Sequence, residues 1–195
     1  NLTNGNLYLE DIIASGNWAY SAGSNGQGGF LAVGASSAVT MNNCYFYKNT
    51  GRATGVIYSA GFIYGEHNIF EENYASASIG AVRVVSNNYQ AFNTIYRSNR
   101  ADSGTGGAVY IDVSGNYYAN GCIFAANIAT IIANTADGGA IFVNNGGYAG
   151  RNNVYYGNRA DRNGGAVVSS TSGRYTETNS IFYNNYSATV PGRAD

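Results

Sequence analysis

The feature that most constrains this sequence is an asparagine that recurs seven times along 195 residues. The seven positions are Asn17, Asn49, Asn73, Asn99, Asn127, Asn158 and Asn185. Successive spacings are 32, 24, 26, 28, 31 and 27 residues, with a mean of 28. A period of this length is typical of repeat proteins, in which each unit packs only on its neighbours.

Two further columns of similar residues precede the asparagine. Three residues before it stand Ala14, Phe46, Phe70, Tyr96, Phe124, Tyr155 and Phe182, of which six are aromatic. Four residues before it stand Ile13, Tyr45, Ile69, Ile95, Ile123, Val154 and Ile181. Columns this uniform predict that equivalent residues of successive repeats lie next to one another in the fold.

A glycine before a short apolar run is the second landmark of each repeat. The dipeptides are Gly28-Gly29, Thr54-Gly55, Ile79-Gly80, Gly106-Gly107, Gly138-Gly139 and Gly164-Gly165. From the second residue of each pair to the next repeated asparagine the distance is 18 to 20 residues, whereas the return distance varies from 6 to 12. The variation in length is therefore confined to one corner, where longer loops are expected over residues 18–27 and 128–137.

Each repeat also contains a turn between two apolar runs, such as Asn87-Asn88 or Gly115-Asn116, and these residue types tolerate a positive φ. A further column follows the turn and reads Leu7, Val39, Ile63, Tyr89, Tyr117, Tyr148 and Tyr175. The pattern predicts three short strands and three corners per coil. We therefore predict an all-β fold, a single-stranded parallel β-helix (solenoid) of about seven coils, with residues 1–195 as a single β-solenoid domain. At about 4.8 Å per coil, the rod would be roughly 30 Å long.

The repeated columns have a structural interpretation. The aromatic column would form a continuous stack inside the coil, and each ring would contribute about 1.5–3 kcal/mol through burial. The asparagines would form an amide ladder at one corner, with about 1 kcal/mol net for each hydrogen bond. The paired glycines would let the chain turn tightly into the next strand.

The joint pattern of an aromatic residue, Asn and Ala, then Gly-Gly-Ala and Val or Ile, occurs at Phe70, Asn73 and Ala75 and again at Gly164-Gly165-Ala166-Val167. It resembles the repeats of the chlamydial polymorphic outer-membrane protein family, over nearly the whole chain. The resemblance implies a right-handed β-helix on a secreted or surface-exposed passenger, often adhesive, and so an extracellular or cell-surface location. The Ile or Val before the aromatic residue departs from the small polar residues expected in that family.

That departure has a consequence for the surface, because adjacent strand residues point to opposite faces. If the aromatic column faces inward, an apolar stripe faces outward. Its residues are Ile13, Ile69, Ile95, Ile123, Val154 and Ile181. A long exposed apolar stripe indicates a contact surface, here for lateral packing against another chain or segment. The alternatives are that a loop or glycan covers the stripe, or that the two faces are reversed.

Composition and charge give little indication of a binding or catalytic function. Charged residues make up 11 % of the chain and the net charge is −1, which gives no basic footprint for nucleic acid. No apolar run approaches 18 residues, so we expect no membrane span. The acidic residues are scattered, and the spacing of Asp102 and Asp161, about 10 Å over two coils, follows from their shared column. We therefore predict no catalytic residue, metal or cofactor, and no enzymatic activity. The alternative is a carbohydrate-active β-helix enzyme with a groove lined by Tyr110, Tyr118 and Phe142.

Cysteines and glycosylation motifs complete the candidate residues. Cys44 and Cys122 share a column but lie three coils apart, about 14 Å, which exceeds the reach of a disulfide. We expect both to be buried free thiols. Asn1-Leu2-Thr3 and Asn185-Tyr186-Ser187 match the N-glycosylation motif, so Asn1 and Asn185 are candidate glycosylation sites.

Neither end of the repeat array shows a recognisable cap, although solenoids usually cover their terminal coils. End-to-end contacts between such coils would build an open filament. We therefore expect an extracellular structural subunit of a surface fibre or filament, assembled as a homopolymer by end-to-end or lateral contacts. The alternatives are a monomeric surface adhesin passenger that binds host or glycan ligands, and the carbohydrate-active enzyme.

Overall fold

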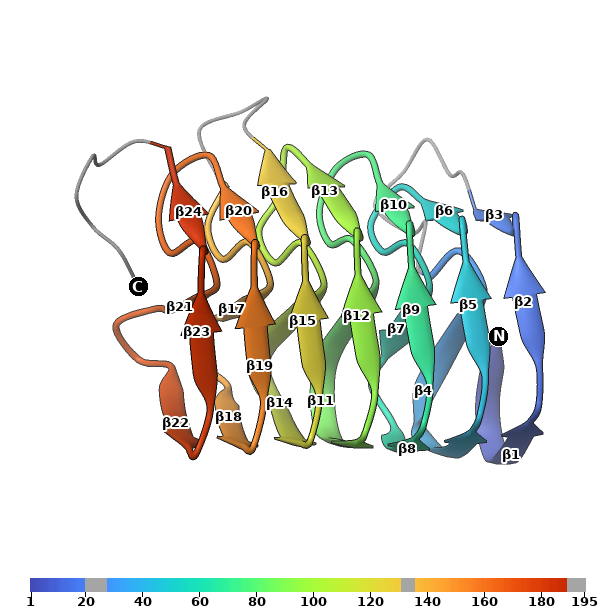
Figure 1. Ribbon diagram of the computed structural model, residues 1–195. Helices are drawn as coiled ribbons and strands as arrows, with labels where there is room; N and C mark the ends of the chain where they lie inside the picture. Colours follow the sequence, from blue (N-terminus) through green and yellow to red (C-terminus); the bar gives the residue numbers. More distant parts are fainter. Residues whose placement is uncertain (20–27, 131–135, 189–195) are drawn as a thin grey trace.

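Stacked coils of parallel β-structure form a rod in the computed structural model, which describes residues 1–19, 28–130 and 136–188 (Figure 1). No helix occurs in these ranges. Each coil contributes to three sheets, which we name A, B and C, and every strand pair in them is parallel. Seven rungs follow one another in each sheet, so the predicted β-solenoid of about seven coils is confirmed.

Sheet A forms one long side of the rod and contains ten strands. They are β1 (Leu2–Glu10), β4 (Leu31–Asn42), β7 (Ile57–Ser59), β8 (Phe62–Glu66), β11 (Val82–Phe92), β14 (Val109–Asn120), β17 (Ile141–Val143), β18 (Gly147–Arg151), β21 (Val167–Ser169) and β22 (Arg174–Thr178).

Sheets B and C have seven strands each. Sheet B contains β2 (Ile13–Ser15), β5 (Tyr45–Tyr47), β9 (Ile69–Glu71), β12 (Ile95–Arg97), β15 (Ile123–Ala125), β19 (Val154–Tyr156) and β23 (Ile181–Tyr183). Sheet C contains β3 (Trp18–Ala19), β6 (Thr50–Gly51), β10 (Tyr74–Ala75), β13 (Arg100–Asp102), β16 (Ile128–Thr130), β20 (Arg159–Ala160) and β24 (Tyr186–Ser187).

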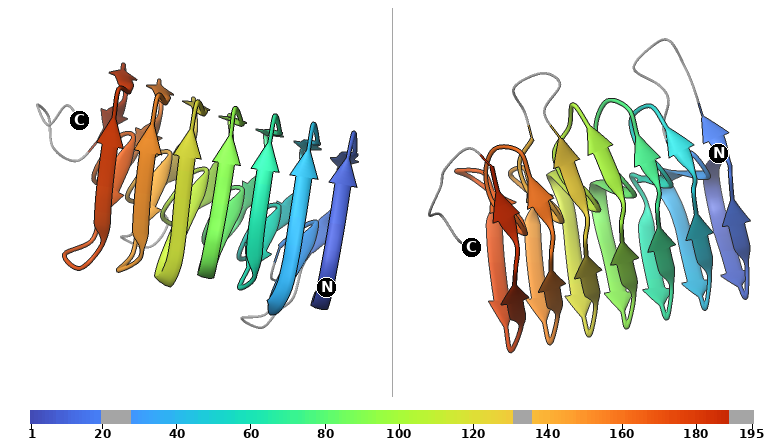
Figure 2. Two further views of the ribbon diagram at one scale, coloured as in Figure 1. Left: turned by 90° about the horizontal axis from the view of Figure 1, so that it is seen from below. Right: turned by 45° about the horizontal axis from the view of Figure 1, so that its top comes forward.

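The path of the chain shows the hand of the coil. In Figure 1 the strands of sheet B run upward in front, and the chain crosses the top through sheet C. It returns downward behind through the first part of sheet A and then forward along the bottom through the second part, which includes β8, β18 and β22. Successive coils advance from the blue end at the right to the red end at the left, which is a right-handed path. The two views of Figure 2 show the rungs stacked in register along the whole rod.

The division of each coil into strands differs from the sequence prediction. The two strands expected on either side of the Asn or Gly turn belong to the same sheet, and in β4, β11 and β14 they are continuous. The third sheet consists instead of the two- or three-residue strands directly after the ladder asparagine. The predicted division was wrong because so short a strand shows no alternating pattern. Of the expected longer loops, residues 20–27 and 131–135 lie outside the described ranges, while Trp18–Ala19 and Ile128–Thr130 form β3 and β16.

The aromatic column packs in the interior. Phe46, Phe70, Tyr96, Phe124 and Tyr155 are fully buried. Their rings stack at centroid distances of 4.7, 4.9, 5.0 and 5.0 Å, and Phe182 continues the stack 4.4 Å from Tyr155. Each distance matches the rung spacing of about 4.8 Å, so the strand ladder itself brings the rings into contact.

Residues in the left-handed backbone conformation, with positive φ, form both corners that flank sheet B. The first corner has Asp11, Asn43, His67, Asn93, Gly121, Asn152 and Asn179, and the second has Gly16, Lys48, Glu72, Ser98, Ala126, Gly157 and Asn184. All fourteen have φ between +47° and +67°. Such a φ costs a residue other than glycine about 1–2 kcal/mol, so the contacts around the corners must offset the strain.

The third corner requires glycine for a steric reason. A Cβ built on Gly29, Gly55, Gly80, Gly107 or Gly139 would lie 1.8 to 2.1 Å from the carbonyl oxygen of the corresponding glycine in the next rung. Real Cβ atoms never approach backbone so closely, so one glycine column allows successive rungs to stack here.

Candidate functional site

The seven repeated asparagines lie in one hydrogen-bonded column between sheets B and C. In the middle of the column, Asn99 Nδ2 donates to Asn127 Oδ1 (3.0 Å) and to the Phe70 carbonyl oxygen (2.9 Å). Its Oδ1 accepts from the backbone N–H (3.1 Å) and the Nδ2 (2.9 Å) of Asn73. Side-chain hydrogen bonds of the same kind connect the ladder from Asn17 to Asn185.

A second, partial amide ladder lies at the corner between sheets A and B and was missed by sequence reasoning. Asn68 Oδ1 accepts from the Cys44 backbone N–H (2.9 Å), and Asn153 Oδ1 accepts from that of Cys122 (2.8 Å). Both asparagines are buried. The column alternates among Ile, Cys, Asn, Thr and Ser, so its sequence carries no uniform signal.

Both cysteines occupy this corner as buried free thiols. Cys122 Sγ donates to the Ala91 carbonyl oxygen (3.4 Å), and Cys44 Sγ to that of Asn42 (3.3 Å). Burial raises the pKa of Cys122 to about 12 and also raises the pKa of Cys44. A high pKa removes the reactive thiolate, so these thiols act as packing groups.

Tyrosine hydroxyls meet inside the coil. The Tyr117 hydroxyl donates to the Tyr96 hydroxyl, which in turn donates to the Tyr89 hydroxyl. Both oxygen–oxygen distances are 3.0 Å. Further along the rod, Tyr148 and Tyr155 share a short hydrogen bond, and Tyr155 donates to Glu177 (3.1 Å). Pairing lets the column contain buried tyrosines, because each hydroxyl finds a partner in the apolar interior.

The two candidate glycosylation sites differ in access. Asn185 Nδ2, the atom that a glycan would occupy, donates to the Tyr155 carbonyl oxygen (3.0 Å), and Asn185 Oδ1 accepts from Asn158 Nδ2 (2.9 Å). In the folded ladder, both the Nδ2 and the Oδ1 atom of the Asn185 amide are therefore hydrogen-bonded. Asn1 is exposed at the start of the chain.

The candidate interface stripe lies on the outer face of sheet B, opposite the aromatic stack. Ile13, Ile123 and Ile181 are 73 %, 39 % and 62 % exposed. Ile69, Ile95 and Val154 are half-buried between their column neighbours. The strand register places all six, with Tyr45, in one continuous column.

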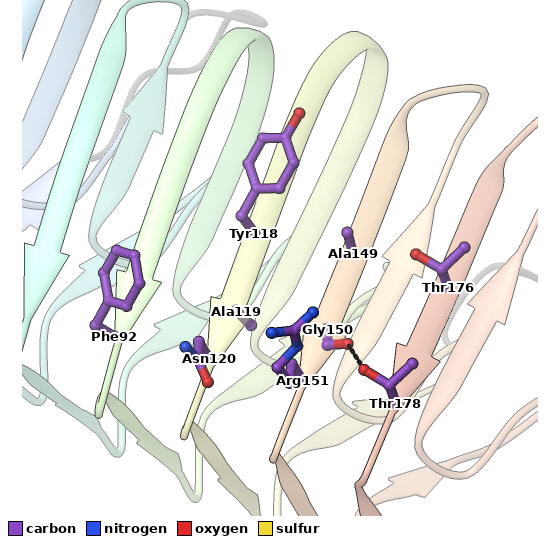
Figure 3. Close-up of a pocket in the computed structure, with 9 residues that line it drawn as sticks. All are labelled: Phe92, Tyr118, Ala119, Asn120, Ala149, Gly150, Arg151, Thr176 and Thr178. Carbon is purple, nitrogen blue, oxygen red and sulfur yellow. Dashed lines mark hydrogen bonds between the residues drawn. The ribbon is translucent and has the colours of Figure 1, made fainter.

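A trough crosses the outer face of sheet A at β18 (Figure 3). The strand register arranges it in three rows, which are Asn116–Gly147–Arg174, Tyr118–Ala149–Thr176 and Asn120–Arg151–Thr178. Glycine and alanine in the middle strand leave a low floor between higher walls on β14 and β22. Two hollows of about 300 and 370 Å³ follow this floor and share Tyr118, Ala149 and Thr176.

The groove expected for a carbohydrate-active enzyme is not formed as one unit. Tyr110 and Phe142 stack at 5.4 Å and line a hollow beside Arg83 and Asp137. Tyr118 lies eight residues further along β14 and lines the trough instead. The bend within the long strand of sheet A separates the two places.

The carboxylates of the described chain are largely held by basic or hydroxyl partners. Burial alone would raise the pKa of Asp102, but hydrogen bonds from Thr130, Arg100 and Tyr74 outweigh it and lower that pKa. Thr130 occupies the rung between Asp102 and Asp161. A carboxyl with a lowered pKa is unsuited to act as a general acid.

No group of three His, Cys, Asp or Glu side chains in the described ranges could hold a metal ion. No helix there is long and apolar enough to cross a membrane.

Comparison of the chain with protein-family models, curated proteins and solved structures gave no match. The assignment to parallel β-helix repeat proteins therefore rests on the stacked coils themselves.

Proposed function

We propose that this chain is a structural unit of an extracellular surface fibre and that it associates with further copies of itself through the outer face of sheet B. The observation that carries the proposal is the outward aliphatic stripe, exposed at Ile13, Ile123 and Ile181. An apolar column along a whole face of a rod indicates a contact surface. The similarity of the repeats to those of chlamydial surface proteins supports the extracellular location.

The charges beside the stripe are compatible with packing. Arg97 and Glu71 form an ion pair with Nη2 and Oε2 2.7 Å apart, and the Tyr45 hydroxyl donates to the same carboxylate. The guanidinium of Arg97 lowers the pKa of Glu71, which keeps the pair ionised. A second chain that packs here would cover a neutralised pair rather than an isolated charge.

The size of this face limits the strength of each contact. Seven rungs of about 4.8 Å and strands of about 10 Å give a footprint of roughly 300 Å². A stable interface buries about 800 Å² per partner, so two rods would associate weakly through sheet B alone. Repetition along a fibre would multiply the contact and give strong overall attachment.

End-to-end stacking is the second mode of association. The first and last strands of each sheet have a paired neighbour on one side only within the described chain. Unpaired strand edges are templates for further pairing, and a subunit added in register would continue the ladder.

The test compares two substitutions of equal charge. Ile123→Glu places a carboxylate in the stripe, and Gln90→Glu places one on the exposed face of sheet A. In sedimentation equilibrium, the average mass of the unaltered chain and of Gln90→Glu should rise with concentration, while that of Ile123→Glu should rise much less, because only its ends can still associate.

Electron micrographs of the same samples should show rods side by side. Single dispersed rods at the highest soluble concentration would refute the fibre. Single-file filaments formed equally by Ile123→Glu would assign assembly to the ends and refute the role of sheet B.

A monomeric adhesin is the second candidate, favoured by the trough on sheet A. The carbohydrate-active enzyme has less support, because Tyr110 and Tyr118 lie in separate hollows and the pKa of Asp102 is lowered.

A further inference from the structure

We infer that the trough on sheet A, between β14 and β22, is a binding site for an anionic oligosaccharide that bears carboxylate or sulfate groups. This inference is independent of assembly through sheet B, because none of the residues that line the trough belongs to sheet B. The charge, the aromatic ring and the shape of the trough support it.

The charge of the trough is unusual for this chain. Five other arginines of the described chain form the ion pairs Arg83–Asp112, Arg97–Glu71, Arg100–Asp102, Arg159–Asp161 and Arg162–Asp137. Arg151 and Arg174 have no side-chain hydrogen bond or ion pair within the described residues, and both line the trough. No Asp or Glu lines it. A chain of net charge −1 therefore gathers two unpaired guanidinium groups at one place.

Guanidinium groups present a planar fork of N–H donors that matches a carboxylate or sulfate. Arg174 pairs in register with Gly147, and Arg151 lies four residues further along β18. Their backbone positions are thus about 13 Å apart along the strand. One small anion cannot contact both groups, so the spacing favours an extended ligand with at least two anionic groups.

The aromatic ring of the trough favours a carbohydrate. Tyr118 is 43 % exposed, and its neighbours in the column are Gln90 and Ala149. The small Ala149 leaves the side of the ring open toward the floor, as Figure 3 shows. Aromatic faces pack against the C–H faces of sugar rings, and nearby amides and hydroxyls fix the orientation. Asn120, Thr176 and Thr178 supply these groups.

The sheet itself disfavours an acidic peptide. Peptides commonly bind to sheets by adding a strand at a free edge. Here β18 pairs with β14 on one side and β22 on the other, so its backbone groups are already engaged. The floor between the walls is also shallow and offers no deep apolar pocket for peptide side chains.

The test is isothermal titration calorimetry on the whole chain with four probes of equal length. These are tetragalacturonate, a sulfated galactan tetramer, neutral maltotetraose and tetraglutamate. Tetragalacturonate, the sulfated tetramer or both should bind, and raising the salt should weaken binding because exposed charges are screened. The two anionic probes distinguish carboxylate from sulfate recognition.

Substitutions locate the site. Arg151→Gln and Arg174→Gln should each lower the affinity about tenfold, as expected for loss of a charge-assisted hydrogen bond. Tyr118→Ala should lower it to a similar extent, and Ala149→Leu should block the floor. Matched controls are Tyr64→Ala, in the same column three rungs from the floor, and Arg159→Gln on sheet C. Both should bind like the unaltered chain.

Several outcomes would overturn the inference. They are equal binding of maltotetraose, equal or tighter binding of tetraglutamate, no binding of any probe, and binding that persists unchanged in Tyr118→Ala and both arginine variants. Ile123→Glu should bind the oligosaccharide normally, because it alters only sheet B. This variant separates failure of the trough from failure of the proposed fibre.

Discussion

At the scale of the residue, asparagine is suited to a ladder because one amide both donates and accepts. Asn99 satisfies the backbone N–H of Asn73 and the carbonyl of Phe70 while it pairs with its neighbours above and below. The residue before each ladder asparagine is in the left-handed conformation, with φ +52° at Lys48. The ladder thus fixes a strained corner that the backbone would not adopt alone.

Replacement of Asn99 by Ala should destabilise the fold strongly. It leaves the Asn73 N–H and the Phe70 carbonyl buried without a side-chain partner, and each orphaned group costs about 1–3 kcal/mol. Chemical denaturation should show a loss of about 2–5 kcal/mol in the free energy of unfolding. The control Asn42→Ala removes an exposed amide and should change it by less than about 0.5 kcal/mol. Equal losses in the two variants would contradict the role of the ladder.

At the scale of the element, the three corners of the coil differ in the residues that they tolerate. Sheet B is bounded by left-handed corners, and the corner that follows it accepts Lys, Glu, Ser, Asn and Ala. A Cβ built at Gly16 or Gly157 of this corner meets nothing within 4 Å. The corner before sheet A accepts only glycine at one position, because the next rung lies directly on it. The variable loops leave between sheet C and this glycine, where no ladder imposes a length.

Replacement of Gly107 by Ala should distinguish these two kinds of corner. Its Cβ would lie 2.1 Å from the Gly139 carbonyl oxygen and 2.6 Å from the Ile128 nitrogen, so two rungs must separate. We expect a loss of about 3 kcal/mol or more in the free energy of unfolding. At Gly157 a Cβ meets nothing within 4 Å, and Ala126 already occupies the same column. Gly157→Ala should therefore cost only about 1 kcal/mol, by the same denaturation measurement.

At the scale of the whole molecule, the interior is an apolar column with tyrosines inside it. Tyr89, Tyr96, Tyr117, Tyr148 and Tyr155 are buried, and burial raises the pKa of each above the ordinary value. Because rungs contact only their neighbours, the packing of these groups adds to the strand pairing, the asparagine ladder and the ring stacking that join successive coils.

This column should make the rod sensitive to alkali. A tyrosine whose folded pKa is raised stabilises the fold below its unfolded pKa of about 10, and that contribution is lost as the pH rises further. Five such groups give a loss of about 7 kcal/mol by pH 11, comparable with the stability of a typical domain. Far-ultraviolet circular dichroism and tyrosinate absorbance should therefore change together near pH 11. Titration of all 18 tyrosines near pH 10 with the dichroism unchanged would contradict this.

Most of the fold could be predicted because a solenoid repeats its environment. The equivalent corner of each coil favours Asn, and the equivalent inner position favours Phe or Tyr. The aromatic column from Phe46 to Phe182 can therefore be recognised from a single sequence. The two-residue strands of sheet C were not visible, since two positions show no period. The partial ladder of Asn68 and Asn153 was hidden because Cys, Thr and Ser also fit its corner.

The sequence by itself determined the coil and the two columns that alternate between the faces of sheet B, because these follow from periodicity and strand alternation. The structure decided that the aromatic column faces inward and the aliphatic stripe outward. Only the tertiary structure decided where Tyr118, Ala149, Arg151 and Arg174 meet, since they come from three separate rungs and share no column pattern. It also separated Tyr110 from Tyr118. The physical reason is that a repeat fixes which residues stack, whereas a surface site depends on the differences between neighbouring repeats.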